Sequence, residues 1–215
     1  MPELLIKTVL AYLVGSLVGS LLLGSVVGVD IRSRGSGNAG ATNAMRTLGR
    51  RFGLAVFAID FLKGWLATAL LARAALPGLA PGAPELTAWS LALCGIAVML
   101  GHVYPLWFGF RGGKGVATLV GVLLGISPAW VGVFALFWLL TVVLTGYVGL
   151  ASMLGALAVA GFAALGAPGA RAPLLGFASA AALLVLYTHR ANIARMRAHT
   201  ESRATRLWLL GARRG

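Results

Sequence analysis

The sequence contains few charged residues: they make up 11% of its 215 residues. A soluble domain usually carries about 25%, and so few charges would leave most of a water-exposed surface apolar. Apolar residues make up 59% of the chain, and its mean hydropathy is +0.91. We therefore expect most of the chain to lie in a lipid bilayer.

Acidic residues and cysteine are especially scarce. Five Asp or Glu residues stand against 18 Lys or Arg residues, which gives a formal net charge of +13. Five acids argue against a carboxylate metal cluster, and a single cysteine, Cys94, excludes an internal disulfide and a multi-Cys metal site. We expect no metal and no cofactor. Because membrane proteins collect basic residues in their cytoplasmic loops, we also expect no nucleic-acid partner.

Long apolar runs are what the sequence does contain, and they predict an all-α membrane protein of about seven transmembrane helices. A span needs roughly 20 apolar residues. The expected spans are 4–29, 52–72, 86–104, 116–127, 129–145, 147–166 and 174–189. The fourth is short and the breaks between the last four are soft, so counts of five or six stay open. The whole chain, 1–215, is expected to form one integral membrane domain.

The distribution of basic residues predicts the orientation of the chain. With the N-terminus outside, the inside segments are 30–51, 105–115, the neighbourhood of 146, and 190–215. Fourteen of the 18 basic residues fall in them, namely Arg32, Arg34, Arg46, Arg50, Arg51, Arg111, Lys114, Arg190, Arg195, Arg197, Arg203, Arg206, Arg213 and Arg214. The outside loops carry Arg73 and Arg171, and Lys7 and Lys63 fall within spans. The positive-inside rule then places the C-terminus in the cytoplasm.

The loop after the first span is rich in hydrogen-bond donors. Its glycines Gly35, Gly37 and Gly40 match the dinucleotide-binding pattern, but a membrane span stands where that motif needs a strand. Closely spaced glycines still allow backbone N–H groups to converge on an anion, and the guanidinium of Arg46 suits a phosphate. The further side-chain donors are Ser36, Asn38, Thr42 and Asn43. We expect a phosphate-binding loop; the alternative is a flexible polar turn.

A second glycine-rich segment, 101–118, resembles a nucleotide-binding P-loop without matching it. Phe108 stands where that motif has its first glycine, and Gly115 where it has Ser or Thr, so nucleotide hydrolysis is unsupported. A phosphate-type cradle around the ammonium of Lys114 is still expected. The amides that would form it are those of Gly112, Gly113 and Gly115. His102, which precedes the cradle, is either a catalytic candidate or a hydrogen-bonded structural histidine.

The remaining polar residues also fall on the side that the charges mark as inside. Ser152 follows a break at 145–147, and His189 and Asn192 are three residues apart, so they share one helix face. No serine-hydrolase elbow is present, because Arg34 precedes the segment 35–37. Such a site is rich in hydrogen-bond donors for an anion and poor in bases, which suits a substrate that carries its own good leaving group.

Four ordered motifs carry a family resemblance that covers nearly the whole chain. Segments 35–43, 101–105 with 112–118, 146–147 and 189–193 resemble those of the bacterial acyl-phosphate:glycerol-3-phosphate acyltransferases, the PlsY family. The resemblance implies transfer of a fatty acyl group from acyl phosphate to the 1-position hydroxyl of glycerol 3-phosphate. The products are lysophosphatidic acid and inorganic phosphate, in the first acylation of phospholipid biosynthesis. Two departures are Gly149, where the family often has Ser, and His199, where Gly is usual.

The resemblance also implies roles for the candidate residues. The acyl phosphate would be surrounded by Ser36, Arg46, Lys114 and Ser152. Glycerol 3-phosphate would be oriented by His189 and Asn192, with support from His102, Lys63 and Glu201. The first loop would be shaped by Asn38, Thr42 and Asn43. The proton acceptor stays open between a substrate phosphate oxygen, His102 and His189.

The implied setting is the bacterial inner membrane, with the active site facing the cytoplasm. The expected partners are glycerol 3-phosphate, long-chain acyl phosphate and membrane lipid, with a functional link to the enzyme that makes acyl phosphate. The alternative function is a membrane transporter for phosphate or an organic phosphate, whose cargo the same loops would bind. Motifs on one face and two halves without a visible repeat disfavour it.

Overall fold

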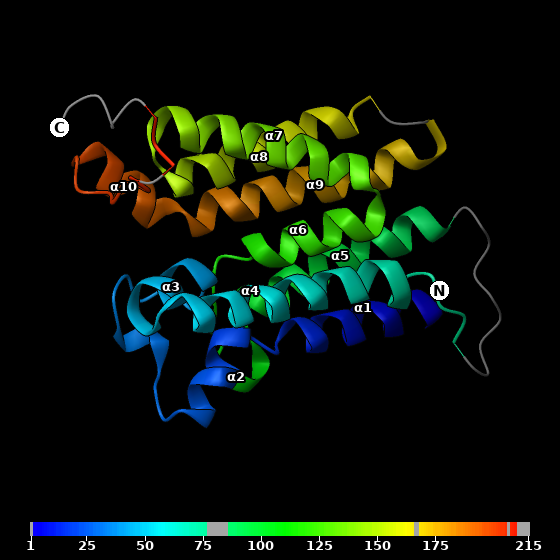
Figure 1. Ribbon diagram of the computed structural model, residues 1–215. Coiled ribbons are helices and arrows are strands. Elements are labelled where there is room, and N and C mark those ends of the chain that lie inside the picture. The colour runs from blue at the N-terminus through cyan, green and yellow to red at the C-terminus, as the bar shows by residue number, and fades with distance from the viewer. Residues whose placement is uncertain (1, 77–85, 166–167, 206, 210–215) are drawn as a thin grey trace. The chain divides into compact units, whose positions relative to one another are not determined.

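The apolar runs of the sequence form helices in the computed structural model, which describes residues 2–76, 86–165, 168–205 and 207–209 (Figure 1). No strand occurs among these residues, so the predicted all-α class is confirmed. The chain divides into two compact units, Met1–Ser127 and Pro128–Gly215. Three of the arginines assigned to the inside, Arg206, Arg213 and Arg214, lie outside the described residues.

The described residues of the first unit form six α-helices and three short 3-10 or π segments. In chain order these are α1 (Pro2–Gly15), α2 (Gly19–Val26), η1 (Ile31–Ser33), α3 (Ala41–Leu48), α4 (Arg50–Trp65), η2 (Leu66–Leu71), α5 (Leu86–Val103), η3 (Leu106–Phe108) and α6 (Val116–Ile126). The second unit holds α7 (Pro128–Thr145), α8 (Val148–Ala163), α9 (Pro168–Thr188) and α10 (Arg190–Arg197).

Four stretches of the described chain are long and apolar enough to cross a membrane. They are Arg50–Leu71, Leu86–Phe108, Pro128–Thr145 and Arg171–Thr188. The pair α1 and α2 is a fifth candidate, bent by 46° at its break, and α6 and α8 are shorter apolar helices. The chain is therefore a multi-pass membrane protein, and the count of seven stays a prediction.

The first predicted span differs from the structure, because 4–29 is two helices rather than one. The break falls at residues 16–18, and Figure 1 shows α2 turning away from α1. Small residues on both sides of the break allow other backbone to approach. A Cβ atom on Gly15 would overlap the Val98 carbonyl of α5. Helix α1 therefore packs tightly along α5, while α2 leaves that direction.

Two other differences concern where helices begin. Helix α3 forms inside the stretch 30–51, which the sequence predicted as a loop. Helix α9 begins at Pro168, six residues before the predicted start at 174. Pro173 lies within it, and because proline has no backbone N–H, one hydrogen bond of this helix is not made. Residues 166–167 of the predicted break lie outside the described residues.

Glycines set the distance between α4 and α6. A Cβ atom on Gly64 would overlap the carbonyl oxygen of Thr118, and one on Gly121 would overlap that of Phe61. In lipid, helices associate by close packing because burial of apolar surface from water is not available, and small residues permit that packing. The close contact of α4 and α6 fixes where α6 begins, and so where the segment before it lies.

The packing of α4 on α6 predicts a difference between two glycine substitutions. Gly121→Ala adds a methyl group against backbone, and overpacking of this kind costs about 1–3 kcal/mol. Gly161→Ala in α8 adds the same group where no atom lies within 4 Å. We expect Gly121→Ala to lower the melting temperature of the detergent-purified protein by several degrees, and Gly161→Ala to leave it nearly unchanged. Equal melting temperatures would contradict this account of α4–α6 packing.

Candidate functional site

The first glycine-rich loop is organised by the buried side chain of Asn43. Its amide nitrogen donates to the carbonyl oxygens of Arg34 at 3.0 Å and Asn38 at 3.1 Å, and its Oδ1 accepts from the N–H of Ser36 at 3.0 Å. Gly35 has a positive φ of 56°, and a Cβ there would overlap Asn43 Oδ1. Asn43 is therefore used in folding the loop, and its predicted contact with phosphate stays a prediction.

Other donors of this loop reach the surface. Ser36, Thr42 and Arg46 are exposed, and Asn38 is half-buried. Thr42 lies in the first turn of α3 and Arg46 one turn later, so both side chains are on the same face of this helix. The positive end of the helix dipole lies at the same end as Thr42. The loop thus presents a hydroxyl and a guanidinium that can contact an anion.

The second glycine-rich segment folds back on the end of α5. The N–H of Gly112 donates to Val103 O at 3.0 Å, and the N–H of Gly113 donates to His102 O at 3.2 Å. These two amides are therefore bonded within the protein, and a direct role as phosphate donors stays a prediction. Gly115 has a φ of 82° and caps the start of α6. The half-buried Lys114 thus lies at the N-terminal end of α6, which favours an anion.

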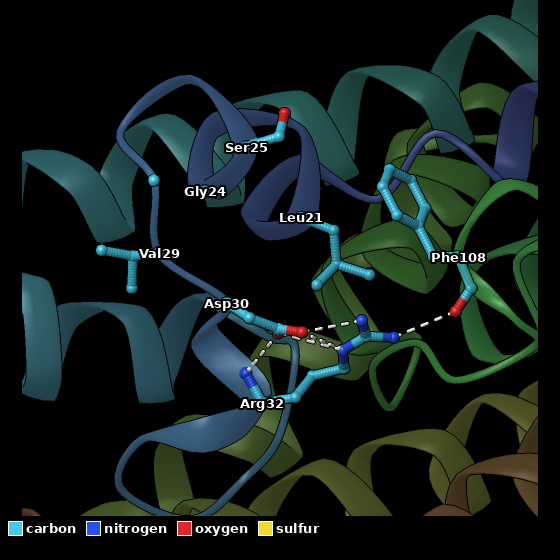
Figure 2. A pocket seen from close by; sticks show the side chains of 8 residues that line it. Leu21, Gly24, Ser25, Val29, Asp30, Arg32 and Phe108 are labelled. Atoms are coloured by element: carbon cyan, nitrogen blue, oxygen red, sulfur yellow. Dashed lines mark hydrogen bonds and ion pairs between the residues drawn. The ribbon is translucent and has the colours of Figure 1, made fainter.

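Arg32 ties the start of the first loop to the segment before Lys114, as Figure 2 shows. Its Nη1 donates to Phe108 O and to Arg111 O, both at 3.0 Å, while its Nη2 lies 2.8 Å from Asp30 Oδ2. Hydrogen bonds from Arg32 hold the pKa of Asp30 below its usual range, so the carboxylate is ionised at neutral pH. These side chains border a pocket of about 240 Å³.

Lys63 and His102, the predicted support residues, meet a third buried side chain. Lys63 Nζ lies 2.9 Å from Asp60 Oδ1 and 2.9 Å from His102 Nδ1. We refer to Asp60, Lys63 and His102 as the buried triad. The sequence analysis missed the role of Asp60, although an acid and a base three residues apart in an apolar run already indicate a pair on one helix face.

In the second unit, Ser152 and His189 are both buried and bonded to backbone. Ser152 Oγ donates to Val148 O at 2.9 Å. His189 Nδ1 lies 2.8 Å from Val185 O. Because a carbonyl oxygen can only accept a hydrogen bond, we assign the ring hydrogen of His189 to Nδ1. Nε2 is then the unprotonated nitrogen of this ring.

Glu201 holds the predicted residue Asn192 in place. Its Oε1 accepts from Asn192 Nδ2 at 2.7 Å, and its Oε2 accepts from Arg195 Nε at 2.6 Å. The two residues that depart from the family pattern have different surroundings. A Cβ on Gly149 would lie 2.9 Å from Asn192 Nδ2, so Asn192 packs against the bare glycine. His199 has a φ of 56°, a left-handed conformation that glycine adopts more readily.

The segment after His199 packs on the turn at Gly146 and Tyr147. The guanidinium of Arg203 lies 4.6 Å from the ring centroid of Tyr147 and 4.1 Å from that of Trp208. The N–H of Ala204 donates to Gly146 O at 2.8 Å. The motif at 146–147 is thereby covered by a cation–π stack, which the sequence analysis did not identify.

Comparison with known proteins finds relatives that match most of this chain. The family model for glycerol-3-phosphate acyltransferase matches residues 5–199. A glycerol-3-phosphate acyltransferase of Geobacter sulfurreducens is 47% identical over 200 residues, which cover 93% of this chain and 96% of that protein. The Aquifex aeolicus protein of the same name is 38% identical over 200 residues, covering 93% of this chain and 98% of its own.

Solved structures show the same fold. PlsY, an integral membrane glycerol 3-phosphate acyltransferase, is 36% identical in its glycerol 3-phosphate form and gives a TM-score of 0.82, with 93% of this chain and 94% of that chain covered. Its lysophosphatidic acid form gives a TM-score of 0.79 over the same shares. With its glycine-rich basic segments and its family match over most of its length, this chain belongs to the glycerol-3-phosphate acyltransferase family.

Proposed function

We propose that this protein transfers a fatty acyl group from acyl phosphate to the 1-position hydroxyl of glycerol 3-phosphate. The observation that carries the proposal is the pairing of two glycine-rich segments, one with Arg46 and one with Lys114, in a chain of this family. Arg32 joins the two segments by hydrogen bonds. Both expected substrates carry phosphate, and the relatives solved in glycerol 3-phosphate and lysophosphatidic acid forms support the acceptor and the product.

The reaction suits a site with many hydrogen-bond donors for an anion. The acceptor hydroxyl oxygen bonds to the acyl carbon, the bond from that carbon to the bridging oxygen breaks, and phosphate leaves with this oxygen. Negative charge therefore grows on the phosphate, where Lys114, Arg46 and Ser36 are proposed to stabilise it. Fixed donors aimed at developing charge supply a large share of the rate enhancement in many enzymes.

The hydroxyl proton needs an acceptor, and the geometry favours the departing phosphate. His102 Nδ1 is engaged by Lys63 and its Nε2 faces Gly113, which argues against direct contact with a substrate hydroxyl. A phosphate oxygen of the substrate can accept the proton without an additional protein group, and the phosphate then leaves as hydrogen phosphate. His189 remains the alternative, since its Nδ1 bond to Val185 O leaves Nε2 as the nitrogen that would face a ligand.

The second unit is proposed to serve the acceptor. His189 and Asn192 would orient glycerol 3-phosphate, with Glu201 fixing the amide of Asn192. Ser152 would add a hydroxyl beside the acyl phosphate. Long-chain acyl phosphate is proposed as the donor, with a functional link to the enzyme that makes it, and the acyl chain would lie among the helices in lipid.

We further propose seven spans in the bacterial inner membrane, with the N-terminus outside and the candidate site on the cytoplasmic side. The bent pair α1–α2, the four long helices, and the shorter helices α6 and α8 together give this number. Helix α6 has 11 residues and covers about half of a bilayer core that is roughly 30 Å thick. The segment before it would therefore complete the crossing. The distribution of basic residues supports the orientation.

Single cysteines test this topology. Cys94 is first replaced by alanine, and one cysteine is then introduced at Ala75 or at Ala198, both exposed. In intact spheroplasts, a membrane-impermeant maleimide is expected to label position 75 and to reach position 198 only after the membrane is opened. Labelling of position 198 in intact spheroplasts would contradict the orientation.

The activity is tested with purified protein in lipid, glycerol 3-phosphate and palmitoyl phosphate. We expect equal amounts of inorganic phosphate and lysophosphatidic acid, because each transfer releases one phosphate. Palmitoyl-CoA is run in parallel and is expected to give no product. A folded sample that makes no lysophosphatidic acid from any donor would overturn the acyltransferase proposal and would favour a transporter.

Removing the cation of the second segment tests the charge-stabilisation mechanism. Lys114→Ala should lower kcat by about a hundred- to thousandfold, the usual effect of losing one donor to developing negative charge. Arg51→Ala removes an exposed cation at the start of α4 and serves as the control, with little change expected. Steady-state rates of phosphate release measure both. Normal activity of Lys114→Ala would refute the mechanism.

A further inference from the structure

The buried triad brings three ionisable side chains together among apolar helices. Asp60 is 1% exposed, Lys63 4% and His102 2%. Asp60 and Lys63 come from α4, and His102 comes from the last turn of α5. Ionisable groups inside a membrane domain are costly and tend to mark functional positions. The contacts of the three side chains show which neighbouring segments they support.

Part of the triad satisfies the backbone where α1 and α2 separate. Lys63 Nζ donates to Gly15 O at 2.9 Å and to Leu17 O at 3.0 Å. Asp60 Oδ1 accepts from the N–H of Gly19 at 3.1 Å. Broken helical backbone in a bilayer needs partners within the protein. Asp60 and Lys63 thus have a clear structural role, and removing one would leave the other charge buried.

His102 adds a different contact, directed at the second glycine-rich segment. Its Nε2 lies where a Cβ atom on Gly113 would overlap it. The carbonyl oxygen of the same histidine accepts from the N–H of Gly113 at 3.2 Å. Gly113 therefore rests on the His102 ring, while Lys63 holds the opposite nitrogen of that ring.

The first glycine-rich loop also approaches Gly113 closely. A Cβ on Gly113 would lie 2.9 Å from the carbonyl oxygen of Ala39. That carbonyl is itself fixed, because it accepts from Ser20 Oγ at 2.9 Å, and Ser20 lies at the start of α2. Gly113, immediately before Lys114, thus lies close to both the His102 ring and the first loop. Arg32 donates a hydrogen bond to the carbonyl oxygen of Arg111, which lies two residues before Gly113.

We propose that His102, held by Asp60 and Lys63, is a positioning residue for Lys114. By supporting Gly113 against Ala39, it fixes the separation between the ammonium of Lys114 and the donors of the first loop. A displacement of about 1 Å in such a group can cost a hundredfold in rate. The proposal rests on the acyltransferase function proposed above, and it assigns His102 no proton transfer.

The test uses His102→Asn, which separates the two sides of the ring. Asparagine retains a polar atom near the place of Nδ1 for Lys63 and removes the part of the ring that supports Gly113. We expect kcat with palmitoyl phosphate to fall about a hundredfold, as misplaced catalytic groups do. The melting temperature should stay close to that of the wild type. His102→Gln, which reaches the place of Nε2, should recover part of the rate.

The pH profile and a second variant distinguish positioning from other roles. A positioning residue leaves the shape of the kcat–pH profile unchanged, whereas loss of a general base removes its acid limb. Gly113→Ala places a methyl group against the same ring and should also lower kcat. Gly113→Ala should lower kcat by a smaller factor in the His102→Asn background, because the shorter asparagine side chain leaves room for the added methyl group. Additive losses would overturn the proposal, even if His102→Asn alone folds poorly.

The ion pair of Lys7 and Glu3 provides a matched control. It is also buried, with 2.8 Å between Lys7 Nζ and Glu3 Oε1, but it lies at the start of α1, away from the break. Lys7→Met should lower the melting temperature and leave kcat of the folded enzyme unchanged. Unchanged kcat in His102→Asn, beside an active wild type, would overturn the positioning role alone. An inactive wild type would overturn the proposed function, and the positioning role with it.

Discussion

Backbone that leaves the helical path inside a bilayer must find its hydrogen-bond partners within the protein, and this constraint organises the first unit. The chain leaves α1 at Gly15 and resumes as α2 at Gly19, and Lys63 and Asp60 supply the partners for the groups between. This charged pair costs free energy within lipid. It brings a carboxylate and an ammonium to the end of α5, where His102 joins them and connects the break to the glycine-rich segments.

The glycine-rich segments are shaped mainly by hydrogen bonds that end on backbone. Asn43 gathers the first loop, and Arg32 holds the segment before Lys114 by two carbonyl oxygens. Several polar residues that look like ligands in the sequence therefore act as supports. The groups proposed to contact phosphate include the exposed Ser36 and Arg46 and the half-buried Lys114. A few cations held by a rigid frame suit a reaction whose leaving group is already a good one.

Much of the fold could be predicted because apolar length is a strong signal in membrane proteins. The predicted span 86–104 is α5 (Leu86–Val103), and 129–145 is α7 (Pro128–Thr145). The bend at residues 16–18 could not be predicted, because it depends on partners 41 to 48 residues away in α4. Helix α3 was missed because its residues are polar and its burial comes from packing on α4.

The candidate site could be predicted by residue type but less well by role. Spacing of glycines and cations indicated an anion site, and the family match supports that interpretation. Spacing does not distinguish an amide that faces a ligand from one bonded to a carbonyl, as at Gly112 and Gly113. The function of His102 depends on a contact between segments that are adjacent only in the folded chain, since Ala39 and Gly113 are far apart in sequence.

In the proposed reaction, phosphate departs from the acyl carbon while fixed donors hold it. The most direct measurement uses palmitoyl phosphate labelled with ¹⁸O at the bridging oxygen, with glycerol 3-phosphate as acceptor. Mass spectrometry then locates the label after turnover. We expect label in the released inorganic phosphate, none in lysophosphatidic acid, and no more in free palmitate than an enzyme-free sample gives. Label in free palmitate above that background would show attack at phosphorus, and would contradict acyl transfer at this site.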